Sequence, residues 1–438
     1  MSIQPETILL PEWVIPIEPR GQVLHRHALV IEGSIIRDIL PEADIASCYP
    51  GVSVRALPGQ VLLPGFVNLH THAGMTLLRG YADDLPLMQW LQDKIWPAEG
   101  QWTRPDFVES GTELACAEFL LRGMTTFNEM YFFPEASAEA ILASGLRAVL
   151  GLTVLEFPTN YASDASDYLH KGLATRDALR HESRLSFALA PHAPYTVSDS
   201  TFEKIVTFAE QLDLPIHLHV HETEHEISDS LKQYGVRPLM RLAKLGVVGP
   251  RLIAVHSVHL DRAEMDLFAR EGVSVAHCPH SNLKLASGIA PITQLLEMGV
   301  NVGIGTDSAA SNNQLDMLSE LRTAALLAKG IASNPALLPA AEALELATLG
   351  GAKALGLQDQ IGSIKVGKQA DLISIQLDDV GSLPVFDPIA QTVYSASHSQ
   401  IQHVWVAGEH LLNARIPTKI DLQTLKHKAQ QWGRKLKG

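Results

Sequence analysis

Short apolar runs alternate with longer amphipathic segments between Pro64 and about residue 361 of the chain. Segments such as PDFVESGTELACAEFLLRG and DSTFEKIVTFAEQLD carry apolar residues at helical spacing and are bounded by Gly or Pro. The apolar runs between such segments are candidate strands: Phe66–His70, Thr125–Glu129, Ala148–Val154, Ser186–Ala190, Pro215–His219, Leu252–His256, Ser274–His277 and Asn301–Gly305. Eight strand-helix units predict an α/β fold, a (β/α)8 TIM barrel.

Both ends of the chain have a different pattern, in which short β-type runs are separated by Gly and Pro. Ala407-Gly408 predicts a hairpin turn within one of these runs, HVWVAGEHLL. We expect residues 1–62 and 362–438 to form one small discontinuous β-sandwich domain around a barrel of residues 63–361. The last segment, DLQTLKHKAQQWGRKLK, predicts a terminal helix with a cationic end.

The composition is ordinary for a compact soluble protein, with 438 residues, 46% hydrophobic and 19% charged. A net charge of −14 repels the phosphates of nucleic acid and of anionic membranes, so we expect a small-molecule substrate. Cys48, Cys116 and Cys278 are far apart, which argues against a disulfide framework or a thiolate zinc site. The start, MSIQPETILLPEW, does not resemble a secretory signal, and no run approaches the roughly 20 apolar residues of a membrane helix. We therefore expect a cytoplasmic protein.

Histidine carries the chemical signal. With 19 histidines in the chain, a His-x-His pair arises by chance about once. His25-Arg26-His27 lies in the N-terminal β-region without an acidic partner nearby in the sequence, and we interpret it as incidental. His70-Thr71-His72 instead ends the apolar strand PGFVNLH, where alternate side chains point to the same face. Two imidazoles on one face at a barrel mouth can bind one metal ion, although a hydrogen-bonded cluster would give the same pattern.

Polar residues also follow later strands at the point where the apolar run stops. His192 follows FALAP, His219 lies in IHLHVHET, His256 follows LIAV, and Asp307 follows NVGIGT. The carboxyl ends of the strands of a TIM barrel converge on one mouth, where catalytic groups gather. Imidazole and carboxylate ligands that leave a position for water are typical of a catalytic metal site.

The segment PGFVNLHTHAGMTLLRGYADDLPLMQWLQDKIWPAE resembles the first-strand signature of the amidohydrolase superfamily, and within it the 5-methylthioadenosine/S-adenosylhomocysteine deaminases. The resemblance extends over nearly the whole chain, through IHLHVHET, AVHSVHL, AHCPHSN, GIGTDS and GSIKVGKQADL. It implies a barrel flanked by a β-sandwich and one divalent metal ion, Zn²⁺ or a similar ion. It also implies hydrolytic deamination of adenine nucleosides (5′-methylthioadenosine, S-adenosylhomocysteine, adenosine) to the inosine analogue and ammonia.

Carried over by position, the resemblance implies four metal ligands: His70, His72, His219 and Asp307. The fourth strand ends in FALAPHAP without a Lys, so the bridging carbamate of two-metal relatives has no obvious source and one ion is expected. His217 and His221 share a face with His219 by alternation, which leaves either of them as an alternative ligand. The resemblance and the spacing to Glu222 favour His219.

The resemblance also implies the catalytic residues, Glu222, His256 and Asp307. Asp307 would accept a proton from water, Glu222 would protonate ring N1, and His256 would orient the attacking oxygen or stabilise developing charge. The substrate-binding residues it implies are Glu99, His192, Glu222 and Asp307, with Glu99 holding the ribose hydroxyls. Alternation alone would not place both His219 and Glu222 inward, so we expect the strand to turn near His221.

Several alternatives stay open at this point. Guanine, cytosine and chlorotriazine hydrolases share much of the metal signature, and a non-catalytic metal-binding scaffold is a different class again. Some relatives have an arginine after the third strand where this chain has LGLTV, which leaves recognition of a homocysteine carboxylate open. Trp90, Trp96 and Trp102 are candidates to cover a base or a sulfur substituent, or are core aromatics. The sequence also leaves the oligomeric state open, a homo-oligomer included.

Overall fold

The computed structural model describes residues 7–437, which cluster into two compact units. One unit contains the chain up to Val67 together with Ala117–Thr126 and Asp316–Ile420. The other contains Asn68–Cys116, Phe127–Leu315 and the chain from Asp421 onward. The domain boundaries expected from the sequence, after residues 62 and 361, stay predictions.

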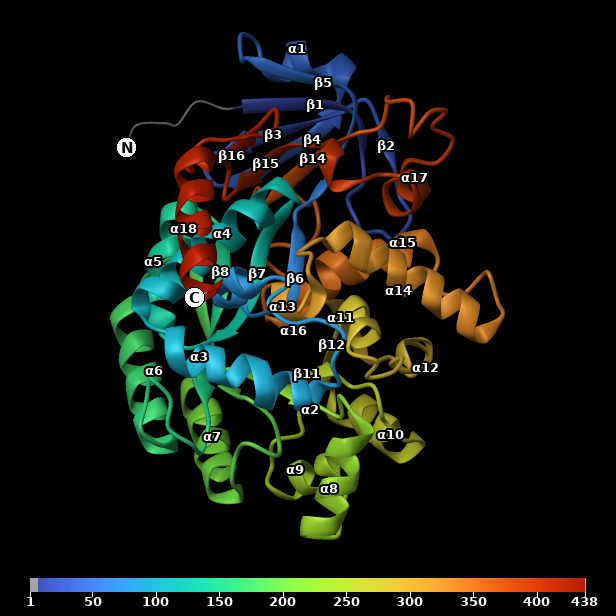
Figure 1. Cartoon of the computed structure of the whole chain (residues 1–438). Coiled ribbons are helices and arrows are strands. Elements are labelled where there is room, and N and C mark those ends of the chain that lie inside the picture. The colour runs from blue at the N-terminus through green and yellow to red at the C-terminus, as the bar shows by residue number, and fades with distance from the viewer. Residues whose placement is uncertain (1–6, 438) are drawn as a thin grey trace. The chain divides into compact units, whose positions relative to one another are not determined.

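Eight strands form a sheet in which each strand lies beside the next one in chain order (Figure 1). They are β6 (Phe66–Thr71), β7 (Met124–Tyr131), β8 (Arg147–Val154), β9 (Leu185–Pro191), β10 (Ile216–Val220), β11 (Leu252–His256), β12 (Ser274–His277) and β13 (Asn301–Ile304). The two ends of this sheet approach each other, because Asp307 N donates to His70 O at 3.0 Å. The result is a nearly closed parallel barrel, so the TIM-barrel prediction is confirmed.

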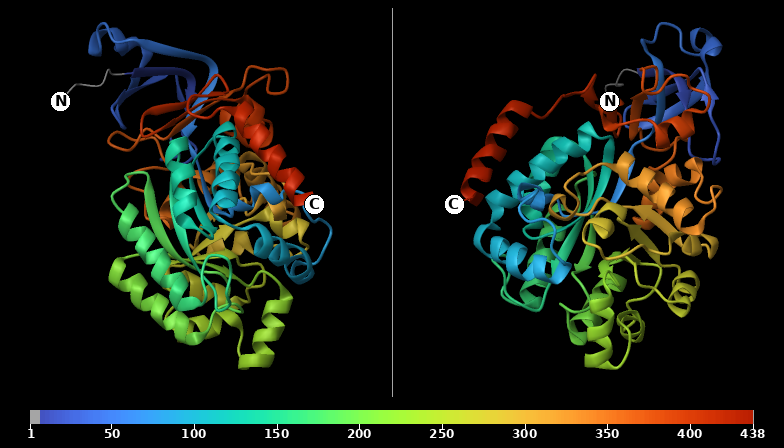
Figure 2. Two further views of the ribbon diagram at one scale, coloured as in Figure 1. Left: turned by 60° about the vertical axis from the view of Figure 1, so that its left-hand side comes forward. Right: turned by 45° about the vertical axis from the view of Figure 1, so that its right-hand side comes forward.

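Helices lie outside these strands, as two further views also show (Figure 2). Residues of β7, β8 and β11 are buried on both faces of the sheet. This burial explains the near-continuous apolar runs of β8 and β11, whereas β7, with the sequence MTTFNEMY, also contains buried polar side chains. The helices that follow strands β7 to β13 in the chain are α5 (Pro134–Ser144), α6 (Ala165–Leu179), α7 (Asp199–Leu212), α8 (Glu224–Tyr234), α9 (Pro238–Lys244), α10 (Arg262–Glu271), α11 (Pro279–Lys284), α12 (Ile292–Glu297), α13 (Ala309–Asn312) and α14 (Met317–Ala332).

The connection after β6 is the longest of the barrel and contains four short helical segments before the long helix α4 (Pro105–Leu121). These segments are η2 (Ala73–Leu78), α2 (Leu87–Trp90), η3 (Leu91–Ile95) and α3 (Trp96–Trp102). Hydrogen-bonding side chains begin several of the barrel helices. At α10 the Asp261 carboxylate and Glu264 form a reciprocal capping box, and Gly272 ends the helix with a φ of 71°.

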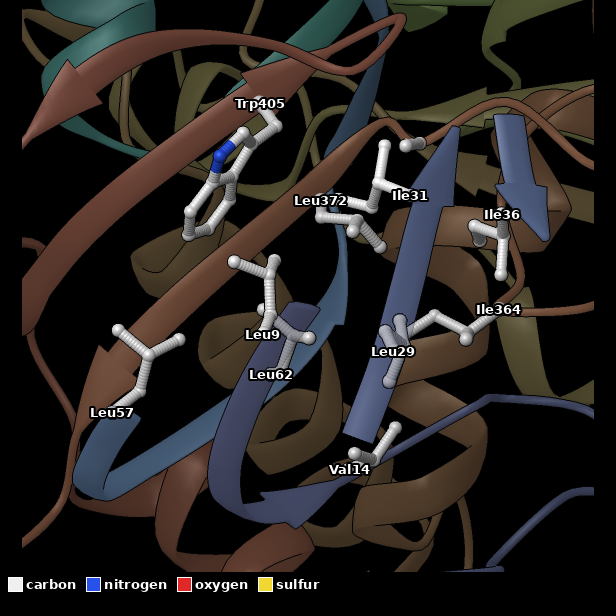
Figure 3. Close-up of a cluster of buried hydrophobic side chains, with 11 residues drawn as sticks. Leu9, Val14, Leu29, Ile31, Ile36, Leu57, Leu62, Ile364, Leu372 and Trp405 are labelled. Carbon is white, nitrogen blue, oxygen red and sulfur yellow. The ribbon is translucent and has the colours of Figure 1, made fainter. Parts of the chain in front are cut away.

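Strands from both ends of the chain form one mixed nine-stranded sheet, which confirms the expected discontinuous β-domain. They are β1 (Thr7–Val14), β2 (Leu24–His25), β3 (His27–Glu32), β4 (Ile35–Pro41), β5 (Val54–Pro64), β14 (Leu372–Gln376), β15 (Ile401–Val406), β16 (Glu409–Asn413) and β17 (Ile416–Pro417). The antiparallel pair β5 and β14 joins the N-terminal strands to the C-terminal ones. Figure 3 shows apolar side chains of this sheet, such as Leu9, Leu62 and Trp405, in one buried cluster.

The predicted turn between β15 and β16 is present. Ala407 and Gly408 have φ values of 48° and 76°, the left-handed pair that a two-residue hairpin turn requires. The remaining helical segments of the described chain are η1 (Glu42–Asp44), α1 (Ile45–Cys48), α15 (Ala340–Glu345), η4 (Leu346–Gly350), α16 (Gly351–Ala354), α17 (Pro388–Tyr394) and η5 (His398–Gln400).

The predicted terminal helix is α18 (Leu422–Lys437), and it belongs to the same unit as most of the barrel. Its Trp432 ring packs edge-on against Phe107 of α4 with 5.3 Å between centroids, and Lys428 Nζ lies 2.6 Å from Glu113 Oε2. None of the helices within residues 7–437 combines the length and the apolar character needed to cross a membrane.

Candidate active site

The four side chains expected to bind a metal ion lie together at the carboxyl ends of β6, β10 and β13. His70 Nε2 lies 3.2 Å from His219 Nε2 and 3.3 Å from Asp307 Oδ1. His72 Nε2 lies 3.4 Å from the same Asp307 oxygen. Two overlapping groups, His70 with His72 and His219, and His70 with His256 and Asp307, each have their ligand atoms within 4.8 Å of one another.

Acceptors behind the rings orient these histidines. His72 Nδ1 lies 2.5 Å from Met130 O, and His219 Nδ1 lies 2.7 Å from His192 O. Carbonyl oxygens only accept hydrogen bonds, so each Nδ1 carries the hydrogen and each Nε2 presents a lone pair to the cluster. His70 Nδ1 lies 2.9 Å from His217 Nε2, which orients the third ring.

The electrostatics of the cluster suit a cation. Burial lowers the pKa of His70 to about 4 and the pKa of His219 well below its usual value, so the imidazoles are neutral at pH 7. Burial by itself would raise the pKa of Asp307, but its hydrogen bond with His70 holds it well below its usual value. Neutral lone pairs and a carboxylate that face one another at 3.2 to 3.4 Å are the donor set of a divalent ion such as Zn²⁺.

Asp307 is fixed at the end of the barrel by its own backbone and by three donors. Its φ is 58°, an uncommon left-handed value for a residue other than glycine. Its Oδ2 accepts hydrogen bonds from Ser281 Oγ at 2.5 Å and Ser311 Oγ at 2.9 Å, and its Oδ1 accepts one from Ser308 N at 2.7 Å. The aspartate therefore keeps one orientation toward His70 and His72.

Glu222 and His256 lie next to this cluster. Glu222 is 7% exposed, and its Oε2 lies 3.8 Å from His256 Nε2. Burial, and then the charge of Asp307, raise the pKa of Glu222 to about 8. His256 Nδ1 lies 2.9 Å from Asn282 Oδ1, which orients the imidazole Nε2 toward the cavity side. A protonated carboxyl and an ionised one thus both lie close to His256 at neutral pH.

The strand turns at His221, as expected, because this residue has a φ of 53° directly after β10. Its ring faces away from the cluster: Leu239 N donates to His221 Nε2 at 3.1 Å. His217 is buried behind His70 rather than beside His72. Of the three histidines that share a face by alternation, His219 is the one grouped with His70 and His72.

Glu99 lies on α3, in the long connection after β6. Its Oε1 accepts a hydrogen bond from Tyr131 Oη at 2.9 Å, and burial raises its pKa to about 7 although Tyr131 opposes the rise. Asn160 Nδ2 donates to Gly100 O at 2.9 Å and to Thr103 O at 3.1 Å. These bonds hold the end of α3, so Glu99 is placed by Tyr131 and Asn160 together.

One cavity of about 370 Å³ joins these groups. Its lining includes His72, His192, His219, Glu222, His256 and Asp307 together with Glu99. Trp90, Trp96 and Phe157 form part of an apolar wall, whereas Trp102 is not among the described lining residues. Among the lining residues that the structure describes there is no lysine or arginine. The cavity therefore suits a neutral ligand with a polar ring system and an apolar substituent.

His192 follows β9 and lines the same cavity. Its Nδ1 lies 3.2 Å from Thr196 Oγ1, and burial lowers the pKa of its imidazole to about 3. Its carbonyl oxygen is the one that orients His219. The backbone carbonyl of His192 therefore orients His219, and its side chain presents a neutral ring to the cavity.

Some residues near the site were not predicted from the sequence. The expectation that His25 lacks an acidic partner also needs correction. Tyr131 follows Glu129 at period two on β7, and this alternation at a strand end is the signal that could have found it. Asn160 lies on a segment without a distinguishing pattern, and Asn282 ends the segment AHCPHSN without a predicted role of its own, whereas His217 was predicted only as an alternative ligand. His25 does have an acidic partner, since its Nε2 lies 2.8 Å from Glu12 Oε1; the two residues are 13 apart in sequence.

Comparisons with known proteins show which family has a sequence similar to this chain. The model of the amidohydrolase family matches residues 61–411 of the chain. A 5-methylthioadenosine/S-adenosylhomocysteine deaminase from Teredinibacter turnerae is 45% identical over 97% of this chain and 96% of its own length. One from Saccharophagus degradans is 43% identical over 98% and 96%.

Two solved structures with bound zinc are similar to this chain in fold as well as in sequence. The crystal structure of an adenosine deaminase from Xanthomonas campestris with bound zinc has a TM-score of 0.96 and 47% identity, over 99% of both chains. An atrazine chlorohydrolase from Arthrobacter aurescens TC1, complexed with zinc, has a TM-score of 0.90 and 25% identity, over 97% of this chain and 99% of its own. The similarity to both structures covers almost the entire chain.

Proposed function

Because the chain belongs to the amidohydrolase family and, within it, to the 5-methylthioadenosine/S-adenosylhomocysteine deaminases, we propose that it removes the 6-amino group of adenine nucleosides by hydrolysis. The observation that carries this proposal is a single cavity lined by Glu222, by a His and Asp cluster and by Glu99. In this proposal the cluster and Glu222 act on the purine ring while Glu99 accepts hydrogen bonds from the sugar. The products are the inosine analogue and ammonia.

The proposal includes one divalent ion, most simply Zn²⁺, held by four residues: His70, His72, His219 and Asp307. Neutral imidazoles and a carboxylate are ligand types that catalytic zinc sites use. When bound, such an ion lowers the pKa of a water molecule to about 7 and so supplies a nucleophile at neutral pH.

The residues of the chain handle the protons. Glu222, with a pKa raised to about 8 by burial and by the Asp307 charge, is protonated at neutral pH and donates to ring N1 as C6 is attacked. Asp307 is ionised and takes the proton that water loses, then returns it to the 6-amino group, which departs as ammonia. The C6 hydroxyl gives its proton back to Glu222 as it becomes the carbonyl of the inosine analogue. His256 is neutral because burial lowers its pKa, and its Nε2 orients the attacking oxygen.

Glu99 supports a nucleoside rather than a free base as the substrate. A carboxylate can accept hydrogen bonds from two adjacent ribose hydroxyls, and one Glu99 oxygen is already oriented by Tyr131. The apolar wall near Trp90 and Trp96 suits the methylthio group of 5′-methylthioadenosine. His192 contributes a neutral ring near the substrate.

A substrate panel on metal-replete protein tests the proposal. Deamination of 5′-methylthioadenosine, S-adenosylhomocysteine and adenosine is followed by the change in adenine absorbance, with ammonia measured independently. We expect 5′-methylthioadenosine to be the best or near-best substrate. Turnover of guanine or a triazine without any nucleoside would contradict the nucleoside assignment, and an inactive metal-replete protein would favour a non-catalytic scaffold.

The proposal extends to the setting of the protein. We propose a cytoplasmic enzyme whose partner is a small nucleoside, with neither nucleic acid nor membrane as a partner, as the net charge of −14 favours. A homo-oligomer is compatible with this proposal, and sedimentation of the purified protein measures the state directly.

A further inference from the structure

The first turn of helix α8 contains a buried carboxylate that is not among the described cavity-lining residues. Glu226 is 6% exposed. Its Oε1 accepts a hydrogen bond from His221 N at 3.0 Å, and its Oε2 accepts one from Glu222 N at 3.0 Å. Both donors are main-chain groups of the segment that leaves strand β10. The two oxygens of one carboxyl group therefore hold two consecutive peptide groups.

This pattern departs from an ordinary helix start. Thr223 caps α8, since its Oγ1 accepts a hydrogen bond from Glu226 N at 3.4 Å. In a capping box, a glutamate at the position of Glu226 would reach back to the amide of the capping residue itself. Here the carboxylate reaches past Thr223 to the two preceding amides. Glu226 thus binds the turn that precedes the helix rather than the capping residue of the helix.

That turn has an unfavourable backbone conformation that needs support. His221 has a φ of 53°, in the left-handed region that side chains with a Cβ seldom occupy. Its carbonyl accepts hydrogen bonds from Val258 N at 3.0 Å and His259 N at 3.1 Å. Glu226 binds the amide side of the same residue, so the turn is held from both ends.

We propose that Glu226 is a positioning residue for Glu222, acting on the peptide turn at His221 and Glu222. The inference rests on the proposed function, in which Glu222 transfers a proton. The Glu222 carboxyl lies 3.8 Å from His256 Nε2, and this placement depends on the direction in which the chain leaves His221. A misplacement of about 1 Å at a reacting group can lower a rate by about 10²-fold.

Glu226→Gln tests the proposal with little change of shape. Glutamine has one acceptor oxygen, so one of the two amides would face an NH₂ group instead. We expect kcat to fall by about 10-fold to 100-fold with KM changed less than about threefold and one metal ion retained per chain. Glu224→Gln, an exposed neighbour on the same turn, is the matched control and should keep the wild-type kcat.

A double variant separates positioning from general destabilisation. If Glu226 acts through Glu222, the kcat of Glu222→Gln/Glu226→Gln should equal that of Glu222→Gln within about twofold. Fold-changes that multiply in the double variant would overturn the proposal, because they would show an effect that does not depend on the Glu222 proton.

Hydrogen exchange tests the same contacts without turnover. In Glu226→Gln the amides of His221 and Glu222 should exchange at least about tenfold faster, while amides within β11 keep their rates. Unchanged exchange at both amides would overturn the proposal. If the wild-type protein deaminates no nucleoside, the proposed function fails, but the exchange result still decides whether Glu226 holds this turn.

Discussion

At the scale of single residues, the chemistry of the site is set by what lies behind each functional group. Carbonyl oxygens of Met130 and His192 hold the Nδ1 atoms of His72 and His219, so their Nε2 lone pairs face the cluster. The pKa values of two buried carboxyl groups are shifted in opposite directions. Burial raises the pKa of Glu222 to about 8, whereas His70 keeps the pKa of Asp307 well below its usual value despite burial. An acid and a base therefore coexist at pH 7.

The acid role of Glu222 has a direct test. Glu222→Gln keeps the shape and the hydrogen bonding of the side chain but removes the transferable proton, so kcat should fall by about 10²-fold to 10⁴-fold. The bound metal should remain, because Glu222 does not belong to either group of closely placed ligand atoms. Ammonia release and metal content measured on the same sample check both points. A wild-type kcat would remove Glu222 from the mechanism.

The role of Glu99 is tested by comparing a nucleoside with its free base. Glu99→Ala removes a buried acceptor of ribose hydroxyls. The kcat/KM for 5′-methylthioadenosine should therefore fall by a factor that corresponds to about 2–4 kcal/mol of lost transition-state stabilisation. Turnover of free adenine, where measurable, should change little. Gln101→Ala, at an exposed position of the same helix, is the control. Equal losses for nucleoside and base would contradict a ribose contact.

At the scale of elements, the sequence is informative wherever a strand is covered on both faces. Strands β11 and β12 begin and end where the apolar runs predict, at Leu252–His256 and Ser274–His277. The residues that follow such strands could be predicted as site candidates, because the carboxyl ends of barrel strands converge. The bond of Tyr131 to Glu99 could not, since it joins a strand end to a helix in a long connection. Its partners are set by three-dimensional packing, which has no periodic signal.

Close packing between elements gives a prediction about Gly111 of α4. A Cβ built on Gly111 would lie 2.1 Å from the carbonyl oxygen of Gly74, in the segment that follows His72. Gly111→Ala should therefore destabilise the protein by about 2 kcal/mol or more, because backbone atoms must move. Gly433→Ala on α18, where a Cβ would meet nothing within 4 Å, should instead stabilise by about 0.5–1 kcal/mol. Urea denaturation measures both, and equal effects would contradict the close approach.

The hairpin β15–β16 gives a prediction about pH. Burial, and then the Arg55 charge, lower the pKa of His403 to about 4 and the pKa of His410 to about 4. Unfolded histidines titrate near about 6.5, so below that pH the unfolded chain binds protons that the folded chain refuses. Stability present above about pH 6.5 is therefore lost as the pH falls toward 4.

His410→Gln should reduce this loss, because one of the two titrating groups is gone. Urea unfolding at pH 7 and pH 5 should show a smaller decrease in the free energy of unfolding for the variant than for the wild type. His181→Gln, at an exposed position, should leave the decrease unchanged. If His410→Gln and the wild type lose stability equally over this range, the pair His403 and His410 does not cause the acid sensitivity.

At the scale of the whole molecule, every described residue of the cavity belongs to one of the two units, the one that contains Asn68–Cys116 and Phe127–Leu315. The metal ligands are thus contributed by segments far apart in sequence, from His70 to Asp307, within that unit. Ions that bind the folded chain and not the unfolded one stabilise it by mass action. Metal binding and folding of this unit should therefore be coupled.

The last prediction concerns this coupling. Purified protein should hold about one divalent ion per chain, and above the dissociation constant each tenfold rise in free ion should add about 1.4 kcal/mol to the free energy of unfolding. The double variant His70→Ala/His72→Ala should lose the ion and this dependence. The double variant His25→Ala/His27→Ala removes the other His-x-His pair and should keep both, because that pair joins no described group of ligand atoms. Elemental analysis and urea unfolding at several zinc concentrations measure the two quantities. Two tightly bound ions per chain would contradict a single-ion site, and an ion retained without His70 and His72 would place the ligands elsewhere.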